Sequence, residues 1–274
     1  MLEPVVSPRP SVVALAASLL LLGACQRENT SPSPAPAPVE TRTPVVAAAP
    51  VPVLDRAAIL QAMDAAASGY AGGQQAGDTS LTGRRFVVRQ SFGCAGPSTD
   101  AAIGDGRAGW AWADGGKALK LTMAPGDWLA SPQIADGAEN WEAAEGFWLT
   151  RPWMRAEGCP FRRNTIATVS PLSASPQAVG LVAVFTEDAS RMGRRNGRAY
   201  EFTVRGEGDQ PPVAPADGYR LVLEGRMAAF ADGRAIRCRA DGPDQRPVCI
   251  GAVRLDRVAF EDGKGAVLSE WRAG

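Results

Sequence analysis

The 274-residue sequence predicts a mainly β domain of the α+β kind, with one N-terminal helix, an antiparallel sandwich or open barrel, and two disulfides. Three observations support this fold class. Segments in which apolar and polar side chains alternate recur between residues 85 and 271, separated by Gly-, Asp- and Pro-rich turns. One segment, 55–68, has helical periodicity, and four cysteines lie in the same region.

Residues 55–68 predict a helix that packs on a larger surface, because its apolar stripe is narrow and rich in alanine. Asp55 is the expected N-cap, since its carboxylate can accept from the free amides of the first turn. Gly69 is the expected C-terminal stop. The residues of the apolar stripe are Ile59, Met63, Ala66 and Tyr70.

The remaining segments are predicted as strands because they are rich in β-branched, aromatic and aliphatic residues between turn signals. We expect strands at 85–92, 109–112, 118–123, 146–150, 177–186, 198–205, 219–229, 235–239, 249–260 and 266–271.

Three features of the sequence indicate how these strands connect. Residues 114–116 (Asp-Gly-Gly) accept positive φ and predict a hairpin. A two-residue turn at 232–233 would place Met227 opposite Cys238 on paired strands. The apolar positions change parity near 256–257, which predicts a bulge or a change of sheet.

The N-terminal region contains an apolar run at 12–22 that ends in Gly23, Ala24 and Cys25. As a helix, this run would span about 17 Å, whereas a bilayer core needs about 30 Å. It therefore has the length of the apolar part of a signal peptide and is too short to span a membrane.

Leu22-Gly23-Ala24-Cys25 resembles the lipobox of bacterial lipoproteins. The resemblance implies that residues 1–24 are a signal peptide and that Cys25 carries the lipid at the new N-terminus. It also implies an envelope location, and Gln26 after the cysteine is typical of release to the outer membrane. Two or three acyl chains anchor a protein stably, since each buried CH₂ contributes about 0.8 kcal/mol.

Residues 25–53 comprise this cysteine and a proline-rich tether, and residues 54–274 form a single strand-rich domain. Seven prolines in 26–53 remove backbone donors and favour an extended spacer of at most about 85 Å. We expect the tether to hold the domain away from the membrane, in reach of peptidoglycan or other envelope proteins.

The composition excludes several classes of function. The chain has no histidine, which excludes His-based catalytic triads, His-ligated metals and His-type pH switches. Its formal net charge is zero, so it lacks the basic excess of a nucleic-acid-binding protein. We predict no cofactor and no metal site.

The four cysteines of the domain are Cys94, Cys159, Cys238 and Cys249. An even number in an exported chain indicates two disulfides, for which three pairings exist. We favour Cys94–Cys159 with Cys238–Cys249, because the second pair is close in sequence and flanks the turn-rich residues 239–248. The alternative of a zinc site lacks the short Cys-x-x-Cys spacing.

Six of the seven tryptophans fall between residues 110 and 153. Trp110, Trp112, Trp148 and Trp153 are candidates for aromatic platforms that face a glycan ligand, with Trp148 and Trp153 the more exposed. Burial in the core is the more common role of such residues and is the interpretation that we favour.

Two charged clusters are the other candidates for a site. Glu139, Glu142 and Glu145 are spaced three apart, beside an expected short helical turn at 140–144, and would be the acid and base of a glycosidase. The second cluster could contact lipid phosphates or acidic polymers and consists of Arg191, Arg194, Arg195 and Arg198. A solvated turn is the simpler explanation of each cluster.

Taken together, these patterns favour a lipid-anchored envelope protein with a binding, scaffolding or assembly role. One alternative is a histidine-independent carboxylate hydrolase that acts on envelope glycan and needs two carboxylates across a cleft. Another is a carrier of a small apolar ligand, which needs an enclosed pocket between its sheets.

Overall fold

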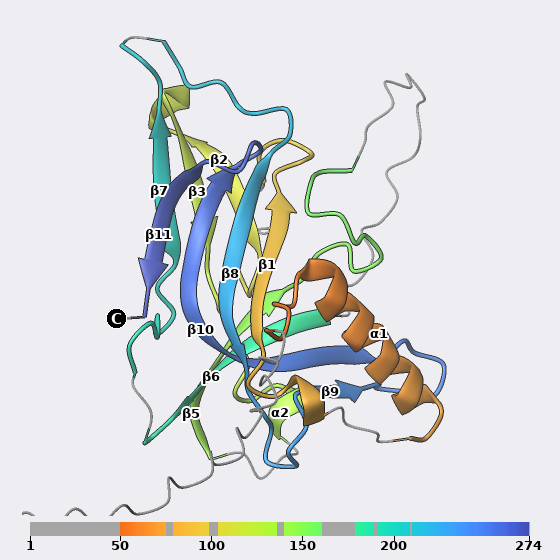
Figure 1. Cartoon of the computed structure of the whole chain (residues 1–274). Coiled ribbons are helices and arrows are strands. Elements are labelled where there is room, and N and C mark those ends of the chain that lie inside the picture. The colour runs from red at the N-terminus through yellow and green to blue at the C-terminus, as the bar shows by residue number, and fades with distance from the viewer. Residues whose placement is uncertain are drawn as a thin grey trace, which may run out of the picture. The chain divides into compact units, whose positions relative to one another are not determined.

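The computed structural model describes residues 50–74, 79–98, 104–135, 140–160, 179–188, 191–208 and 210–273, which belong to one compact unit (Figure 1). The predicted signal peptide, Cys25, most of the tether and Glu139 lie outside the described residues. Within the described part of the chain, each helix is too short or too polar to cross a membrane.

The predicted mainly β class is confirmed. The strands are β1 (Arg85–Phe92), β2 (Ala108–Ala113), β3 (Ala118–Met123), β4 (Gly126–Asp127), β5 (Trp141–Trp148), β6 (Val179–Thr186), β7 (Tyr200–Arg205), β8 (Tyr219–Met227), β9 (Ile236–Arg239), β10 (Val248–Asp262) and β11 (Val267–Arg272). The helices are α1 (Arg56–Ala71), the four-residue α2 (Pro132–Ala135), and the 3₁₀ turns η1 (Thr79–Leu81) and η3 (Asp114–Gly116). The short α2 was not among the predicted elements.

The strands form two sheets and no closed barrel. The larger sheet has the order β1-β8-β10-β6-β5-β4, with β9 and β11 also paired to β10, and the smaller sheet is β2-β3-β7. The expectation of a wholly antiparallel arrangement is wrong at one place, since β6 and β10 pair in parallel. The chain between these two strands includes β7, β8 and β9, which is long enough for the crossover that a parallel pair requires.

Strand β10 organises the larger sheet. Its first residues, 248–253, pair with β9 and β6, and its later residues pair with β8 and β11. A register shift between Leu255 and Arg257 confirms the bulge predicted from the change of parity. Figure 1 shows β10 bending as it passes from the β6 side to the β8 side, as a bulged strand does.

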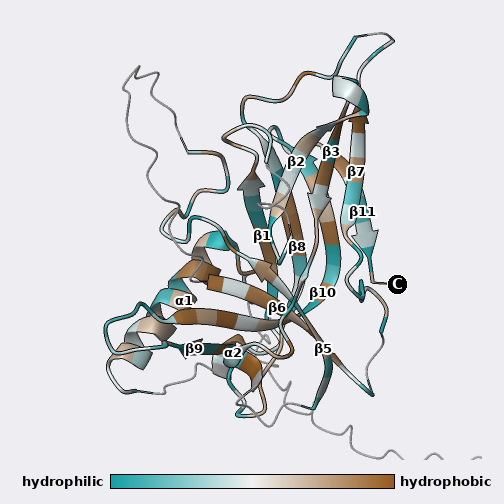
Figure 2. Ribbon diagram, turned by 180° about the vertical axis from the view of Figure 1, so that it is seen from behind, coloured by the Kyte–Doolittle hydropathy of each residue, from teal (hydrophilic) through white to brown (hydrophobic). Residues whose placement is uncertain are grey.

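The main core lies between the smaller sheet and the β1-β8-β10 part of the larger sheet, and it continues beneath α1. Its side chains fill the space between the sheets, and they include Trp110, Leu121, Tyr219, Leu223 and Phe260. A smaller cluster around Trp128, Ile134, Val182, Phe230 and Ile250 covers the opposite face of β6 and the start of β10. Figure 2 shows hydrophobic stretches along β3, β6 and β10, in agreement with this burial.

Helix α1 confirms most of the predicted helix. The Asp55 carboxylate accepts from the Ala58 amide at 2.8 Å, and Ile59 and Met63 are buried. The helix passes the predicted stop at Gly69 and ends at Ala71, where the amide of Gly72 donates to the Ser68 carbonyl.

Both disulfides have the predicted pairing, with Cα–Cα distances of 5.5 Å for Cys94–Cys159 and 4.0 Å for Cys238–Cys249. The predicted pairing of Met227 with Cys238 is wrong. Met227 pairs with Val253 instead, and Cys238 lies directly opposite Cys249 on β9 and β10.

The residues after Met227 explain this difference. The Phe230 amide donates to the Arg234 carbonyl, so 228–235 forms a longer loop than a two-residue turn. The expected helical turn at 140–144 is also wrong, because these residues begin β5 and pair with β6. The hairpin at 114–116 is confirmed by the β2–β3 register.

Candidate functional site

The arginine loop, residues 191–198, precedes β7 and consists of two successive turns. The amide of Arg194 donates to the Arg191 carbonyl at 3.2 Å, and that of Arg198 donates to the Arg195 carbonyl at 3.0 Å. Asn196 has φ 52°, a left-handed conformation that asparagine tolerates better than most residues. The loop therefore has a defined backbone conformation with four arginines along it.

Two carboxylates on β5 hold this loop in place. Glu142 pairs with Arg191 at 2.7 Å and with Arg194 at 3.3 Å. One oxygen of Glu145 accepts from two backbone amides of the loop, Arg195 at 2.7 Å and Asn196 at 2.9 Å. The structure thus brings together the acidic and basic clusters that the sequence shows about 50 residues apart.

An irregularity in β5 explains why both carboxylates reach the loop. In a regular strand, Glu142 and Glu145 would point to opposite faces of the sheet, because successive side chains alternate. The register with β6 shifts between Trp141 and Ala143, which makes Glu142 an extra, bulged residue. The bulge offsets the alternation by one residue and allows both carboxylates to face the arginine loop.

Glu145 is the more buried of the two carboxylates, with 7% of its surface exposed. Burial raises the pKa of its carboxyl above the ordinary value, although the two amides and the nearby Arg194 and Arg195 act in the opposite direction. Burial, together with the charge of Glu145, likewise raises the pKa of the Tyr200 hydroxyl. The observed contacts of Glu142 and Glu145 are those of residues that position a loop.

A pocket of about 260 Å³ lies on one side of the arginine loop, between the start of β7, the bulge of β10 and the end of β11. Figure 1 shows the C-terminal end of the chain close to the loop that precedes β7. Five of the lining residues are arginines, and one is acidic. The lining consists of Gly193, Arg194, Arg195, Arg198, Tyr200, Leu255, Asp256, Arg257, Val258, Trp271, Arg272 and Ala273. We call this the arginine pocket.

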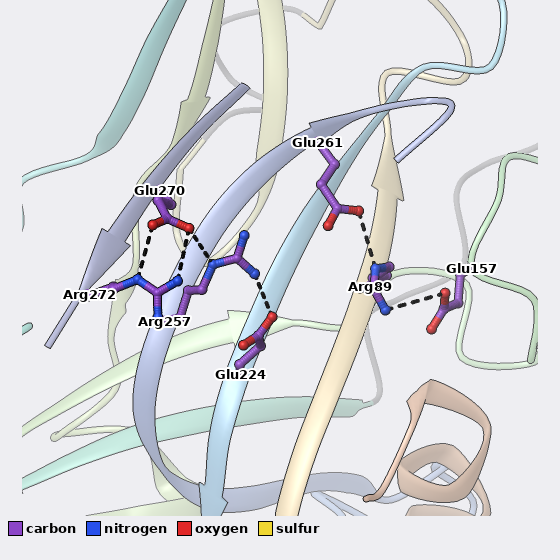
Figure 3. Close-up of polar contacts among 7 residues, drawn as sticks. All are labelled: Arg89, Glu157, Glu224, Arg257, Glu261, Glu270 and Arg272. Atoms are coloured by element: carbon purple, nitrogen blue, oxygen red, sulfur yellow. Dashed lines mark hydrogen bonds and ion pairs between the residues drawn. The ribbon is translucent and has the colours of Figure 1, made fainter. Parts of the chain in front are cut away.

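Two of these arginines, Arg257 and Arg272, belong to an ion-pair network that joins β8, β10 and β11 (Figure 3). Arg257 donates from Nε to Glu270 at 2.8 Å and from Nη1 to Glu224 at 2.5 Å. Arg272 donates from Nε and Nη2 to the same Glu270. Burial disfavours the charge of Arg257, but its two carboxylate partners outweigh burial and raise its pKa.

Arg195 and Arg198 are bound differently. Arg195 donates from Nε and Nη2 to the carbonyls of Arg198 and Ala199, and its guanidinium lies 4.6 Å from the centre of the Tyr200 ring. Arg198 donates from Nε to the Arg195 carbonyl. Among the described residues, no carboxylate forms an ion pair with either guanidinium, and both residues line the pocket.

A second pocket, of about 360 Å³, lies on the other side of the loop. Its lining includes Asp127, Glu142, Glu145, Arg194 and Asn196. In the described part of the chain, acidic and cysteine side chains form no group of three that could hold a metal ion. Of the carboxylates in this second pocket, Glu142 and Glu145 contact the arginine loop, and Asp127 accepts from the Leu129 amide instead.

The four candidate tryptophans lie elsewhere. Trp110 is buried against Trp112 and Tyr219, and Trp112 is 46% exposed. Trp148 is half-buried, with its ring centre 4.5 Å from that of Trp128, and Trp153 is 59% exposed. None of the four is among the residues that line the arginine pocket.

Sequence reasoning missed the other half of the pocket, namely Tyr200, Arg257, Trp271 and Arg272. The one signal that could have found Arg257 is the parity change at 256–257. An arginine that alternates with apolar residues on a strand otherwise looks like an ordinary solvent-facing position.

Comparisons with protein-family models, with curated proteins and with solved structures find no match for this chain.

Proposed function

We propose that this chain is a lipid-anchored cell-envelope protein whose domain binds an anionic component of the envelope in the arginine pocket. The observation that carries the proposal is the lining of that pocket by five arginines and one acidic residue. Guanidinium groups are always charged and offer paired N–H donors that match carboxylate and phosphate oxygens. A binding role agrees with the absence of histidine from the sequence.

The contacts of the carboxylates favour binding over glycan hydrolysis. A glycosidase needs one carboxyl group to protonate the leaving oxygen and a second to act on the opposite face of the sugar. Glu142 is engaged by two arginine side chains, and one oxygen of Glu145 is engaged by two backbone amides. Both groups would have to leave the loop before they could act on a substrate.

The packing between the sheets also disfavours an apolar-ligand carrier. Such a carrier needs an enclosed apolar cavity, as in ligand-binding barrels. Here Trp110, Leu121, Tyr219 and Phe260 belong to one continuous core between the two sheets. The arginine pocket, in contrast, opens at the edge where β7 and β11 approach each other, with Tyr200 and Trp271 in ring contact at 5.1 Å.

The proposed location in the cell envelope is based on the lipobox resemblance. Lipidation of Cys25 would hold the chain at the outer membrane, and the tether would allow the domain to reach peptidoglycan or neighbouring envelope proteins. We expect Cys25→Ala to move the full chain from the membrane fraction to the soluble periplasmic fraction, measured by fractionation and immunoblotting. Retention of the variant in the membrane fraction would contradict the proposed anchor.

Binding is tested with the full chain in a neutral detergent. Inorganic phosphate, glucuronate and polygalacturonate serve as anionic probes, and dextran serves as the neutral control. We expect at least one anionic probe to bind, and the double variant Arg195→Gln/Arg198→Gln to lose at least about tenfold in affinity, or about 1.4 kcal/mol. Equal, weak retention of every anion and of dextran would refute the proposed function.

A further inference from the structure

We infer that the arginine pocket takes a phosphate monoester, the terminal phosphoryl group of an envelope lipid head group or sugar. This inference rests on the proposed function and specifies its ligand class. It follows from three observations: where the unused donors of the pocket come from, how large the pocket is, and which negative charges surround it.

The unused donors of the lining arginines belong to three separate elements. On the arginine loop, Nη1 of Arg195 and both terminal nitrogens of Arg198 take no part in the hydrogen bonds described above. The same holds for Nη2 of Arg257 on β10 and for Nη1 of Arg272 on β11. Among the described residues, these nitrogens have no hydrogen-bond acceptor, so the pocket can satisfy a ligand that has acceptors and no donors.

The arrangement fits a tetrahedral group better than a planar one. A carboxylate offers two acceptor oxygens that lie in one plane, which matches the two parallel N–H groups of one guanidinium fork. A phosphate monoester presents three terminal oxygens that point in different directions. The lining has donors on three elements, the loop, β10 and β11, which matches in number the three oxygens of a phosphoryl group, whereas a carboxylate has two.

The size of the pocket limits what enters it. Its volume of about 260 Å³ is close to the lower end of small-molecule sites, which start at roughly 300 Å³. A phosphoryl group and part of the sugar or glycerol that bears it can occupy such a space. A long acidic polymer would extend beyond it and would use the pocket only through a terminal group.

The positive charge that remains in the lining favours a doubly charged ligand. Asp256 lines the pocket, Glu145 lies behind the loop, and Glu270 neutralises part of the charge on Arg257 and Arg272. With five arginines against these carboxylates, the net charge of the lining stays positive, and its attraction grows with the negative charge of the ligand. A phosphate monoester carries about −1.5 to −2 charges at neutral pH and gains more from the same donors.

The test compares three ligands that share one sugar ring: glucose 6-phosphate, glucuronate and glucose. Isothermal titration uses the full chain in a neutral detergent at neutral pH. We expect glucose 6-phosphate to bind at least about tenfold more tightly than glucuronate, and glucose to show no measurable binding. Arg198→Gln should weaken glucose 6-phosphate binding by at least about fivefold.

Arg205→Gln is the matched control. Arg205 lies on β7, its side chain is 74% exposed, it is absent from the pocket lining, and its loss changes the net charge by the same amount. This variant should bind glucose 6-phosphate within about twofold of the wild type. Both side chains are exposed and neither belongs to the core, so we expect both variants to fold like the wild type. Circular dichroism and thermal unfolding check this.

The results separate the two proposals. Glucuronate that binds as tightly as glucose 6-phosphate, with both weakened by Arg198→Gln, would overturn the phosphoryl specificity and leave an anion-binding function. Equal loss in Arg198→Gln and Arg205→Gln would overturn the pocket as the site. Absence of binding by every anion would overturn the proposed function as well.

Vesicles distinguish the two sources of a phosphoryl group. The unlipidated full chain, Cys25→Ala, is sedimented with vesicles of phosphatidylcholine alone or with added phosphatidic acid, which carries a phosphate monoester. Sedimentation that requires phosphatidic acid and is lost in Cys25→Ala/Arg198→Gln supports a lipid head group. Binding of glucose 6-phosphate without such sedimentation supports a sugar phosphate, and failure of both refutes the inference.

Discussion

Arginine is used in opposite ways at two loops of this protein. In residues 150–160, which follow β5, the loop backbone is held by guanidinium donors. Arg56 of α1 is fully buried and donates to the carbonyls of Thr150, Arg151 and Met154 at 2.9 to 3.2 Å. In the arginine loop, the carboxylate of Glu145 on β5 accepts from two backbone amides, and three of the four arginines line a pocket.

The two sites differ in how many guanidinium N–H groups are left without a hydrogen-bond acceptor inside the protein. Arg56 also donates to the Gln90 side chain at 2.7 Å, so its polar atoms are largely satisfied inside the protein. Burial and the neighbouring Arg151 lower the pKa of Arg56 to about 10. A buried arginine whose donors are used by backbone carbonyls stabilises a structure. Arginines with spare terminal nitrogens at a pocket can bind a ligand, and Arg195 and Arg198 of the arginine loop have such nitrogens.

The largest effect on stability is expected when the Cys94–Cys159 disulfide is removed. This disulfide spans 65 residues, so Cys94→Ser/Cys159→Ser should lower the free energy of unfolding by about 4 kcal/mol on the chain-entropy estimate. The bridge Cys238–Cys249 spans 11 residues, and its loss should cost about 3 kcal/mol. Urea unfolding measures both, and a larger loss for the shorter bridge would contradict this ranking.

The next effect comes from the buried arginine. Arg56→Leu removes the donors from several loop carbonyls and from Gln90, and we expect a loss of about 3 kcal/mol in the free energy of unfolding. Anion binding should stay within about twofold of the wild type, because Arg56 is absent from the arginine pocket. A variant of unchanged stability and reduced binding would reverse the roles assigned to the two loops.

The smallest effect concerns the pH dependence of stability. Burial raises the pKa of Glu145, so the folded state holds this proton more tightly than the unfolded chain does. Its contribution to stability is fully present below the ordinary pKa of 4.5 and is lost as the pH rises through the folded-state pKa. Glu145→Gln should remove this slope.

The measurement is urea unfolding of wild type and Glu145→Gln at several pH values from 4.5 to neutral. We expect the stability of the wild type to fall relative to the variant as the pH rises. Parallel pH profiles would mean that Glu145 titrates alike in the folded and unfolded states. Its two amide contacts and the nearby arginines would then fully offset the effect of its burial on the pKa.

Local patterns in the sequence predicted local features. The mainly β class, the Asp55 cap, the disulfide pairing and the bulge near 256–257 follow from periodicity, spacing and turn residues. The parallel β6–β10 pair and the β9–β10 pair depend on which distant strands meet, and short-range patterns contain no such information.

From the sequence, the residues of the candidate site were predicted only as separate clusters. The sequence indicates Glu142 and Glu145 as one cluster and the arginines of 191–198 as another. The contact between these clusters depends on a bulge in β5, and no turn residue in the sequence predicts that bulge. Arg257 and Arg272 reach the pocket because β10 bends and β11 pairs beside it. Only the fold places them opposite the loop.

The central claim is that spare donors on the arginine loop bind phosphoryl groups, whereas the arginines of the other loop do not. The most direct measurement compares the affinity of the full chain for inorganic phosphate in Arg198→Gln and in Arg155→Gln. Arg155 lies in the 150–160 loop, pairs with Asp64 and has a side chain that is 42% exposed. We predict a loss of at least about fivefold for Arg198→Gln and no change for Arg155→Gln. Equal affinities in the two variants would contradict the assignment.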